Sequence, residues 1–179
     1  MRYYYSMNSS TTNLSARALA SAELAHQRAT GGNGLGDIAI YIQIRACHAM
    51  MNDRLSRLLA PYELSNVGYF AMMILYSRPE NLANPSELCD ATGETRGNMT
   101  RICDELVEKG WMLRVPNPED RRRVDLSLSK SGMKLLNDIV PKLGQKSAEF
   151  YKANFTKAEK ATLQQLLSQF AESLANAPV

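Results

Sequence analysis

The chain has 179 residues, enough for one domain or two small ones sharing a core, and 45% of its residues are hydrophobic. It shows no apolar run of roughly 18 residues and no secretory signal, so we expect neither a membrane span nor secretion. The net charge of +3 is too small to indicate a partner, and three cysteines without metal-ligand spacing (Cys47, Cys89, Cys103) favour the reducing cytoplasm.

Residues 1–36 are predicted to form a flexible N-terminal extension. They are rich in Ser, Ala and Arg and poor in acidic residues, which is also typical of a transit peptide. The segment ends in the linker-like GGNGLG, and a partly ordered helix is possible over residues 14–28. Of the two interpretations we favour the extension.

Residues 37–59 carry two conflicting patterns. The first residues alternate as a strand would, with isoleucine at positions 38, 40, 42 and 44. The later apolar residues follow helical spacing, at Ile44, Cys47, Met51, Leu55 and Leu58. Because the run is too long for an ordinary strand and Asp37 suits an N-cap, we predict one long helix.

Residues 61–93 are predicted to hold two helices. Pro61 marks a break, and Ser65 caps a helix that ends near Arg78. A short helix then begins at Asn84, a good N-cap, with Pro85 at its first position and a glutamate three residues after the cap. Gly93 is expected to end this helix.

The next predicted elements are a helix and a β-hairpin. Thr95 caps a helix that runs to Lys109 and stops at Gly110. Residues 111–115 and 124–128 are then expected to pair as strands around a loop at 116–123. In the second strand Val124, Leu126 and Leu128 share one parity, and Asp125, Ser127 and Ser129 share the other.

Two further helices complete the predicted fold. The first begins at Ser129 and is expected to be disturbed at Pro141. The second begins with a capping box formed by Thr156 and Glu159. Apolar residues at Leu163, Leu166, Leu167 and Phe170, together with Ile38 and Ile42, exceed what a small lobe can bury, so we expect a homodimer.

The helix after Gly93 has a face suited to reading DNA. On a helical wheel Met99, Ile102 and Leu106 point to the core. The opposite side of the N-terminal half carries Arg96, Gly97, Thr100 and Arg101, and Asn98 lies beside them. A helix that enters the major groove end-on reads DNA with its first turns. The alternative is an ordinary amphipathic helix with solvated charges.

The hairpin loop concentrates positive charge at Arg121, Arg122 and Arg123. Residues 78–130 as a whole carry nine Lys/Arg against ten Asp/Glu, so any DNA contact must use placed charges instead of bulk attraction. An arginine-bearing hairpin tip can enter a minor groove, with Asp120 fixing the shape of the loop. A solvated charge run is the alternative.

This region resembles the MarR family of winged-helix transcriptional regulators, and looks most like its multidrug-efflux repressors. The matching segments are Pro85-Ser86-Glu87-Leu88, Thr95-Arg96-Gly97-Asn98-Met99-Thr100-Arg101, residues 104–111, Asp120-Arg121-Arg122 and residues 124–132. The resemblance covers roughly residues 37–175 and is most specific over 85–132. Ser129 replaces the commoner threonine but keeps a capping hydroxyl.

The resemblance implies a mainly α fold with a small β-hairpin wing. Residues 61–132 would be a winged helix-turn-helix DNA-binding lobe, and 37–60 with 133–179 a helical dimerisation region. The expected DNA-binding residues are Thr95, Arg96, Gly97, Asn98, Thr100, Arg101, Asp120, Arg121, Arg122 and Arg123, with Arg122 entering the minor groove and Asp120 supporting it. The expected partners are a pseudo-palindromic DNA operator and a second copy of the chain, and the expected role is repression.

By the same resemblance, a small aromatic or phenolic effector would release the DNA. Its expected ligand-binding residues are Tyr41, Arg45, His48, Met51, Tyr69 and Met73, a cation and polar groups among apolar ones. We expect no metal, cofactor or catalytic activity, because neither histidine has a second ligand at suitable spacing and no catalytic constellation is present. The alternatives are a redox-sensing regulator that uses Cys47, Cys89 or Cys103, and a winged helix that binds only proteins.

Overall fold

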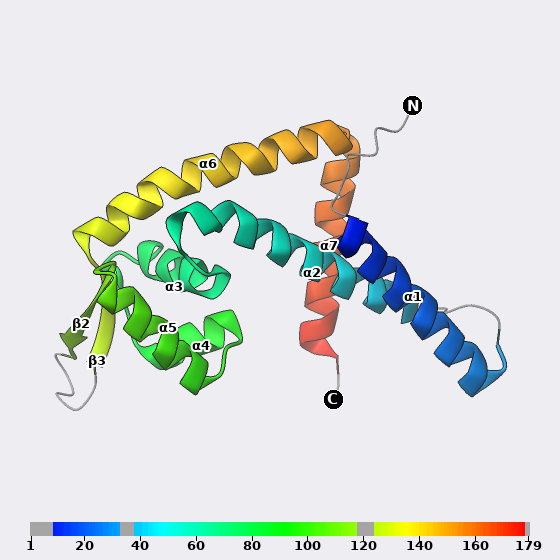
Figure 1. Cartoon of the computed structure of the whole chain (residues 1–179), viewed down its shortest axis with the longest axis horizontal. Coiled ribbons are helices and arrows are strands. Elements are labelled where there is room, and N and C mark those ends of the chain that lie inside the picture. The colour runs from blue at the N-terminus through cyan, green and yellow to red at the C-terminus, as the bar shows by residue number, and fades with distance from the viewer. Residues whose placement is uncertain (1–8, 33–37, 118–123, 178–179) are drawn as a thin grey trace. The chain divides into compact units, whose positions relative to one another are not determined.

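The computed structural model describes residues 9–32, 38–117 and 124–177, which form a mainly helical chain with one small sheet (Figure 1). The chain divides into two compact units, Met1–Tyr69 and Phe70–Val179. The predicted DNA-binding residues Asp120, Arg121, Arg122 and Arg123 lie outside the described residues.

The first unit is built from long helices. Helix α1 spans Ser9–Thr30, longer on both sides than expected, and contacts α2, which spans Ile38–Leu59. The isoleucine alternation therefore belongs to a helix, as predicted, although the proposed Asp37 cap lies outside the described residues. A 3-10 turn over Ala60–Tyr62 follows, with Pro61 inside it.

Helix α3 spans Asn66–Tyr76 and begins as predicted. The Ser65 hydroxyl oxygen accepts a hydrogen bond from the backbone N–H of Gly68, at 3.1 Å. A side-chain oxygen in this position satisfies one of the N–H groups that the first helical turn leaves free. Within the first unit, the Asn66 amide also donates to the carbonyl oxygen of Asn52, at 2.8 Å, and so ties the start of α3 to α2.

In the second unit, helices α4 (Pro85–Thr92) and α5 (Arg96–Glu108) form the predicted helix-turn-helix. Asn84 and Glu87 make a complete capping box, and Thr95 accepts from the backbone N–H of Asn98 at 3.3 Å. Gly93 ends α4 with φ of 72°, in the left-handed region that glycine adopts most easily. The two helix starts and the turn between them are confirmed.

The sheet has three antiparallel strands in the order β1-β3-β2. Strands β2 (Met112–Pro116) and β3 (Val124–Leu128) are the predicted hairpin, with Arg114 opposite Leu126. Strand β1 (Leu82–Ala83) was not predicted, because two residues are too few to show a periodic pattern. It pairs with Ser127 and Leu126 on the outer side of β3.

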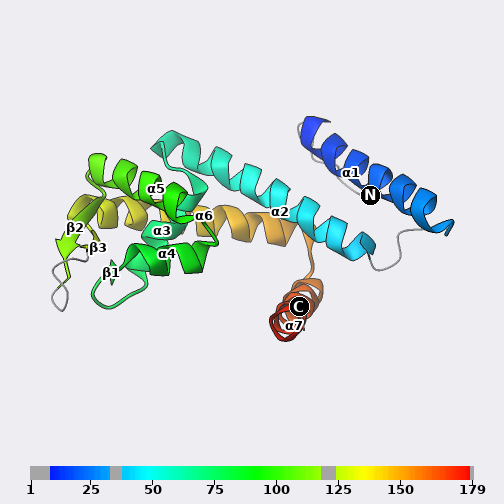
Figure 2. The same ribbon diagram turned by 90° about the horizontal axis from the view of Figure 1, so that it is seen from below.

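The core of the second unit gathers around α5 and the sheet. In Figures 1 and 2 the sheet lies at the start of α6, beside α4 and α5. Residues no more than 4% exposed include Leu75, Leu88, Met99, Ile102, Leu106, Met112, Leu126, Leu128, Leu136 and Ile139. Helix α5 thus contributes one buried face and one exposed face, as the helical wheel predicts.

Two long helices complete the chain. Helix α6 spans Lys130–Asn154 and starts at Ser129, whose hydroxyl accepts from the Gly132 N–H at 3.0 Å. The expected disturbance at Pro141 is wrong: the helix continues through it, since one missing N–H removes only one of many backbone bonds. Helix α7 spans Lys157–Asn176 and carries the predicted capping box. Among the described helices, none taken singly has both the length and the apolarity to cross a bilayer.

Candidate nucleic-acid interface

Helix α5 separates its core residues from a polar outer surface. Met99, Ile102 and Leu106 are at most 3% exposed and anchor the helix. On the other side, all four residues predicted from the helical wheel, Arg96, Gly97, Thr100 and Arg101, are exposed, and Asn98 is half-buried. We call these four residues and Asn98 the α5 polar surface.

Gly97 has no structural reason to be glycine. A Cβ built on Gly97 would meet no described atom within 4 Å, and its backbone is helical. Glycine inside a helix costs about 1 kcal/mol relative to alanine. No contact within the described part of the chain requires glycine at this position.

The side chains of the α5 polar surface are partly held by local bonds. The Thr100 hydroxyl donates to the carbonyl oxygen of Arg96 at 2.9 Å. The Asn98 amide nitrogen donates to Glu94 at 2.7 Å, and its oxygen accepts from Arg101 at 3.0 Å. Asn98 was expected to bond bases or the DNA backbone. Its side chain already donates one hydrogen bond to Glu94 and accepts one from Arg101.

The acidic residues in the C-terminal half of α5 are mostly paired. Asp104 forms an ion pair with Arg114 on β2, which links the helix to the hairpin. Glu105 binds Lys109 at 2.8 Å, and the Lys109 ammonium lies 5.1 Å from the centre of the Trp111 ring. Exposed pairs of this kind contribute little to stability, but they reduce the negative charge that DNA would meet.

The junction between hairpin and α6 is packed tightly. The hydroxyls of Ser129 and Ser131 both donate to the carbonyl oxygen of Gly110. A Cβ at Gly132 would overlap the backbone carbonyl of Trp111, so only glycine fits there. The start of α6 is therefore fixed against the base of the hairpin.

The MarR family model matches residues 64–124, the region just described. The curated protein MarR of Escherichia coli K12 is 35% identical over 123 residues, which cover 67% of this chain and 85% of that protein. The chain belongs to the MarR family. The transcriptional repressor MprA of E. coli K12 is 33% identical over 100 residues, and the match spans only 57% of its length and 54% of this chain.

Solved structures of MarR-family proteins share the fold. A cysteine-to-serine mutant of E. coli MarR in complex with operator DNA superposes with a TM-score of 0.63 at 27% identity, covering 76% of this chain and 99% of that one. Sco3205 of Streptomyces coelicolor, also crystallised with DNA, gives a TM-score of 0.69 at 20% identity, covering 83% of this chain and 96% of that one; this second likeness concerns the fold alone. The winged helix-turn-helix predicted from the sequence is confirmed.

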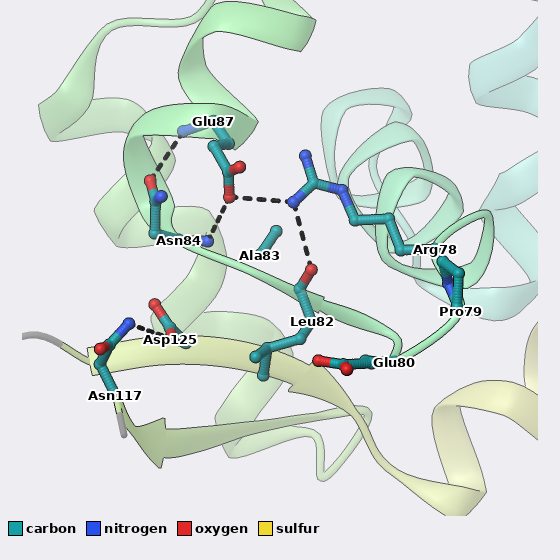
Figure 3. Close-up of a pocket in the computed structure, with 9 residues that line it drawn as sticks. All are labelled: Arg78, Pro79, Glu80, Leu82, Ala83, Asn84, Glu87, Asn117 and Asp125. Atoms are coloured by element: carbon teal, nitrogen blue, oxygen red, sulfur yellow. Dashed lines mark hydrogen bonds and ion pairs between the residues drawn. The ribbon is translucent and has the colours of Figure 1, made fainter. Parts of the chain in front are cut away.

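A pocket of about 430 Å³ opens beside β1 and the loop end of the hairpin, where β2 ends and β3 begins (Figure 3). It is lined by residues from the α3–β1 turn, β1, the start of α4 and the hairpin: Arg78, Pro79, Glu80, Leu82, Ala83, Asn84, Glu87, Asn117 and Asp125. None of these residues was expected from the sequence to bind a ligand. Sequence patterns give little indication of this pocket, because it depends on β1, a two-residue strand that was not predicted.

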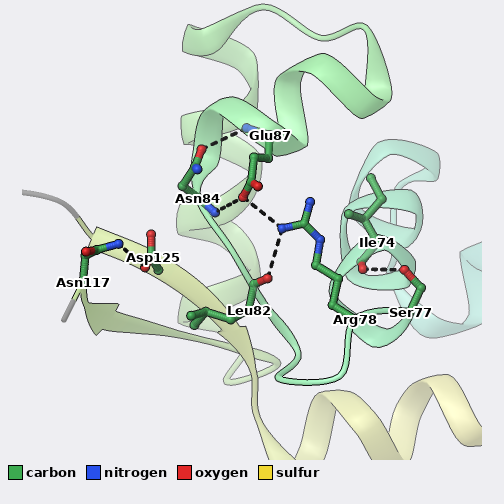
Figure 4. Close-up of polar contacts among 8 residues, drawn as sticks. All are labelled: Ile74, Ser77, Arg78, Leu82, Asn84, Glu87, Asn117 and Asp125. Carbon is green, nitrogen blue, oxygen red and sulfur yellow. Dashed lines mark hydrogen bonds and ion pairs between the residues drawn. The ribbon is translucent and has the colours of Figure 1, made fainter. Parts of the chain in front are cut away.

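Two separate sets of hydrogen bonds join residues that line this pocket (Figure 4). Arg78 donates to the Glu87 carboxylate at 2.9 Å and to the carbonyl oxygen of Leu82 at 3.2 Å. The backbone N–H of Asn84 and the Arg78 guanidinium lower the pKa of Glu87 below its ordinary value. Across the pocket, Asn117 donates to Asp125 at 2.7 Å.

Asp125 also breaks the parity pattern of its strand. It is only 4% exposed, whereas Val124, which shares a parity with the buried Leu126 and Leu128, is 44% exposed. The alternation therefore fails at the first two residues of β3. The Asn117 bond compensates part of the cost of burying the carboxylate, which is how a polar residue takes an inward position here.

The six residues expected to bind an effector lie on α2 and α3. Arg45 bonds the Tyr41 hydroxyl at 3.4 Å and lies 6.0 Å from the centre of its ring, and His48 bonds Asn52 at 2.8 Å. Met51 is 63% exposed. Burial raises the pKa of Tyr69, and Met73 is half-buried. None of the six lines the pocket beside β1 and the loop end of the hairpin.

The three cysteines differ in their surroundings. Cys47 is exposed, and Cys89 and Cys103 are buried. Burial, with a smaller contribution from Asp104, raises the pKa of Cys103 to about 11. The thiolate is the form that reacts with oxidants, so Cys103 is a poor redox sensor at neutral pH. This weakens the redox alternative for that residue.

Proposed function

We propose that the chain is a homodimeric DNA-binding transcriptional repressor whose α5 polar surface enters the major groove. One observation carries this proposal: two arginines, a threonine and an exposed glycine whose added Cβ would meet no described atom lie together at the start of a helix anchored by its opposite face. Arginine and threonine at the start of a recognition helix bond base edges and phosphates. Gly97 leaves space for the DNA backbone.

The relatives support different parts of this proposal, one DNA binding and another repression. E. coli MarR, to which the chain is 35% identical, has a mutant crystallised with operator DNA, and MprA is named a transcriptional repressor. Carried over from the family pattern, Arg122 would reach the minor groove with Asp120 in support and Arg121 and Arg123 beside it. Thr95 would cap the recognition helix and approach the phosphates.

Dimerisation is supported by helix α7. It buries none of its residues in the single chain, and Leu166, Leu167 and Leu174 are 58%, 49% and 61% exposed. Soluble monomers rarely leave such an apolar face uncovered. We propose that a second copy covers it, and that the two-fold symmetry of the pair matches a pseudo-palindromic operator.

A small aromatic or phenolic compound is the proposed effector. Arg45 and Tyr41 already contact each other on α2, and together they offer a cation, a hydroxyl and a ring face to such a ligand. His48, Met51, Tyr69 and Met73 are the further residues proposed to bind it. The ligand would release DNA only to the extent that it binds more tightly to a DNA-free arrangement of the dimer.

The test is a fluorescence anisotropy titration of labelled DNA from upstream of the protein's own gene, against scrambled DNA of the same length. Arg101→Ala should weaken binding to the specific DNA by about tenfold or more, since a base contact contributes about 1–3 kcal/mol. Lys160→Ala is the control, because it removes one exposed positive charge from α7. Equal affinity of the wild type for both DNAs would reject the proposal.

A further inference from the structure

A chain of polar contacts runs along one side of α5, with its members three or four residues apart. The Glu94 carboxylate accepts from the Asn98 amide nitrogen at 2.7 Å, and the Asn98 oxygen accepts from Arg101 at 3.0 Å. On its other side, Arg101 approaches the Glu105 carboxylate at 3.8 Å. Residues at this spacing lie on the same face of a helix, so the chain is continuous.

The chemistry of the end groups allows only one orientation of the Asn98 amide. An ionised glutamate only accepts hydrogen bonds, and an arginine only donates them. Asn98 must therefore turn its NH2 toward Glu94 and its oxygen toward Arg101. If Glu94 were replaced by an uncharged amide that can also donate, Asn98 could turn round, and its oxygen would no longer be directed at Arg101.

Arg101 is the residue that benefits from this arrangement. Its side chain is 68% exposed and would otherwise sample many rotamers. Asn98 accepts a hydrogen bond from the Arg101 guanidinium, and the Glu105 carboxylate attracts the same group from 3.8 Å. The group has five N–H donors, so donors remain for a base edge. Ordering a long side chain before binding reduces the entropy that binding must overcome.

We propose that Glu94 and Asn98 are positioning residues that orient Arg101 for base recognition and so set sequence specificity. The proposal rests on the proposed DNA-binding function. It explains a half-buried acid in the turn before a DNA-reading helix, where a negative charge repels phosphates. Glu94 raises the difference between specific and non-specific binding while lowering attraction to DNA in general.

Glu94→Gln separates these two effects, because it removes the charge and keeps the shape. Glu108→Gln is the matched control: it removes one exposed acid from the far end of α5, away from the chain of contacts that begins at Glu94 in the preceding turn. Binding is measured to the operator, to operators changed one base pair at a time, and to scrambled DNA, with Arg101→Ala marking the base pair that Arg101 reads. Thermal melting by circular dichroism checks that each variant is folded.

Both variants should bind scrambled DNA slightly more tightly than the wild type. Only Glu94→Gln should reduce discrimination at the Arg101 base pair, by roughly threefold to tenfold, the range of one hydrogen bond. In an Arg101→Ala background this extra loss should disappear, because the two residues act together. Asn98→Ala should reproduce the loss of discrimination.

A uniform change across all base pairs, or additive effects of Glu94→Gln and Arg101→Ala, would overturn the positioning role. These results differ from failure of the proposed function. In that case the wild type itself would not distinguish operator from scrambled DNA, and no variant could change a preference that does not exist.

Discussion

Helices α5 and α7 belong to the same compact unit and have equally clear sequence signals, yet they end in opposite surroundings. Both begin at a threonine that accepts a backbone hydrogen bond. Helix α5 buries Met99, Ile102, Cys103 and Leu106, whereas α7 buries none of its residues. Local capping therefore determines where both helices begin, but only tertiary packing distinguishes a helix that completes a core from one whose apolar residues stay exposed.

The largest expected effect is at Gly132, where the start of α6 packs against the backbone between α5 and the hairpin. Gly132→Ala should lower the free energy of unfolding by about 3 kcal/mol, because its Cβ would overlap the Trp111 backbone, which cannot turn away as a side chain can. Chemical denaturation measures the change. Gly144→Ala, later in the same helix, is the control: a Cβ there meets no described atom, and alanine should stabilise the helix by up to about 1 kcal/mol.

If Gly132→Ala were as stable as the wild type, the close packing of Gly132 against the Trp111 backbone would be refuted. If Gly144→Ala were as damaging as Gly132→Ala, the contrast between a packed and an open part of α6 would fail.

Next in size is the effect expected at the proposed dimer interface on α7. Leu166→Glu should raise the dimer dissociation constant at least about tenfold, because a leucine buried at an interface contributes about 1.5–3 kcal/mol and each copy loses one. Sedimentation equilibrium measures the constant. Gln165→Glu adds the same charge at the preceding residue, on the opposite side of the helix from the leucines. This control should change the dissociation constant little. A dimer unaffected by Leu166→Glu would place the interface elsewhere.

The smallest expected effect concerns the polar support of α4. The pKa of Glu87 is lowered in the folded chain, so its carboxylate adds stability above its ordinary pKa near 4.5, and this stability is lost as pH falls through the lower folded pKa. Glu87→Gln should therefore be less stable than the wild type by about 0.5 kcal/mol at pH 7, because glutamine can keep the bond to the Asn84 N–H but loses the negative charge that the helix N-terminus favours.

Urea unfolding at pH 7 and at lower pH values measures this difference, which should close as the pH falls. Glu80→Gln, at another acid of the same pocket, should lie closer to the wild type at pH 7 than Glu87→Gln does. A difference for Glu87→Gln that does not depend on pH would mean that the ionised carboxylate is not the stabilising group.

Most of the fold could be predicted from the sequence, because its signals are local. The caps at Asn84, Thr95, Ser129 and Thr156 and the breaks at Gly93 and Gly110 are each contained in a few neighbouring residues. The core face of α5 followed from helical periodicity alone. One local signal was misleading. Pro141 was expected to disturb α6, but the helix continues through it from Lys130 to Asn154.

The site was only partly predictable. Exposure of Arg96, Gly97, Thr100 and Arg101 follows from the helical wheel, but the contacts that orient Arg101 depend on rotamers that the wheel does not contain. Asp125 was placed with the polar parity of its strand and lies inside, because its partner Asn117 comes from the other strand of the hairpin. The pocket beside it requires β1, whose two residues carry no pattern.

Strand β1 also has a consequence for the order in which the chain folds. The β2–β3 hairpin joins residues close in sequence and can form early, but Leu82 meets Ser127 only after the chain has closed a loop that contains α4, α5 and β2. Such a closure costs more entropy than the hairpin does. The β1–β3 pairing should therefore form late and exchange its amide hydrogens before the rest of the sheet. Strand β3, already paired with β2, gains β1 as its second neighbour only when this larger loop has closed.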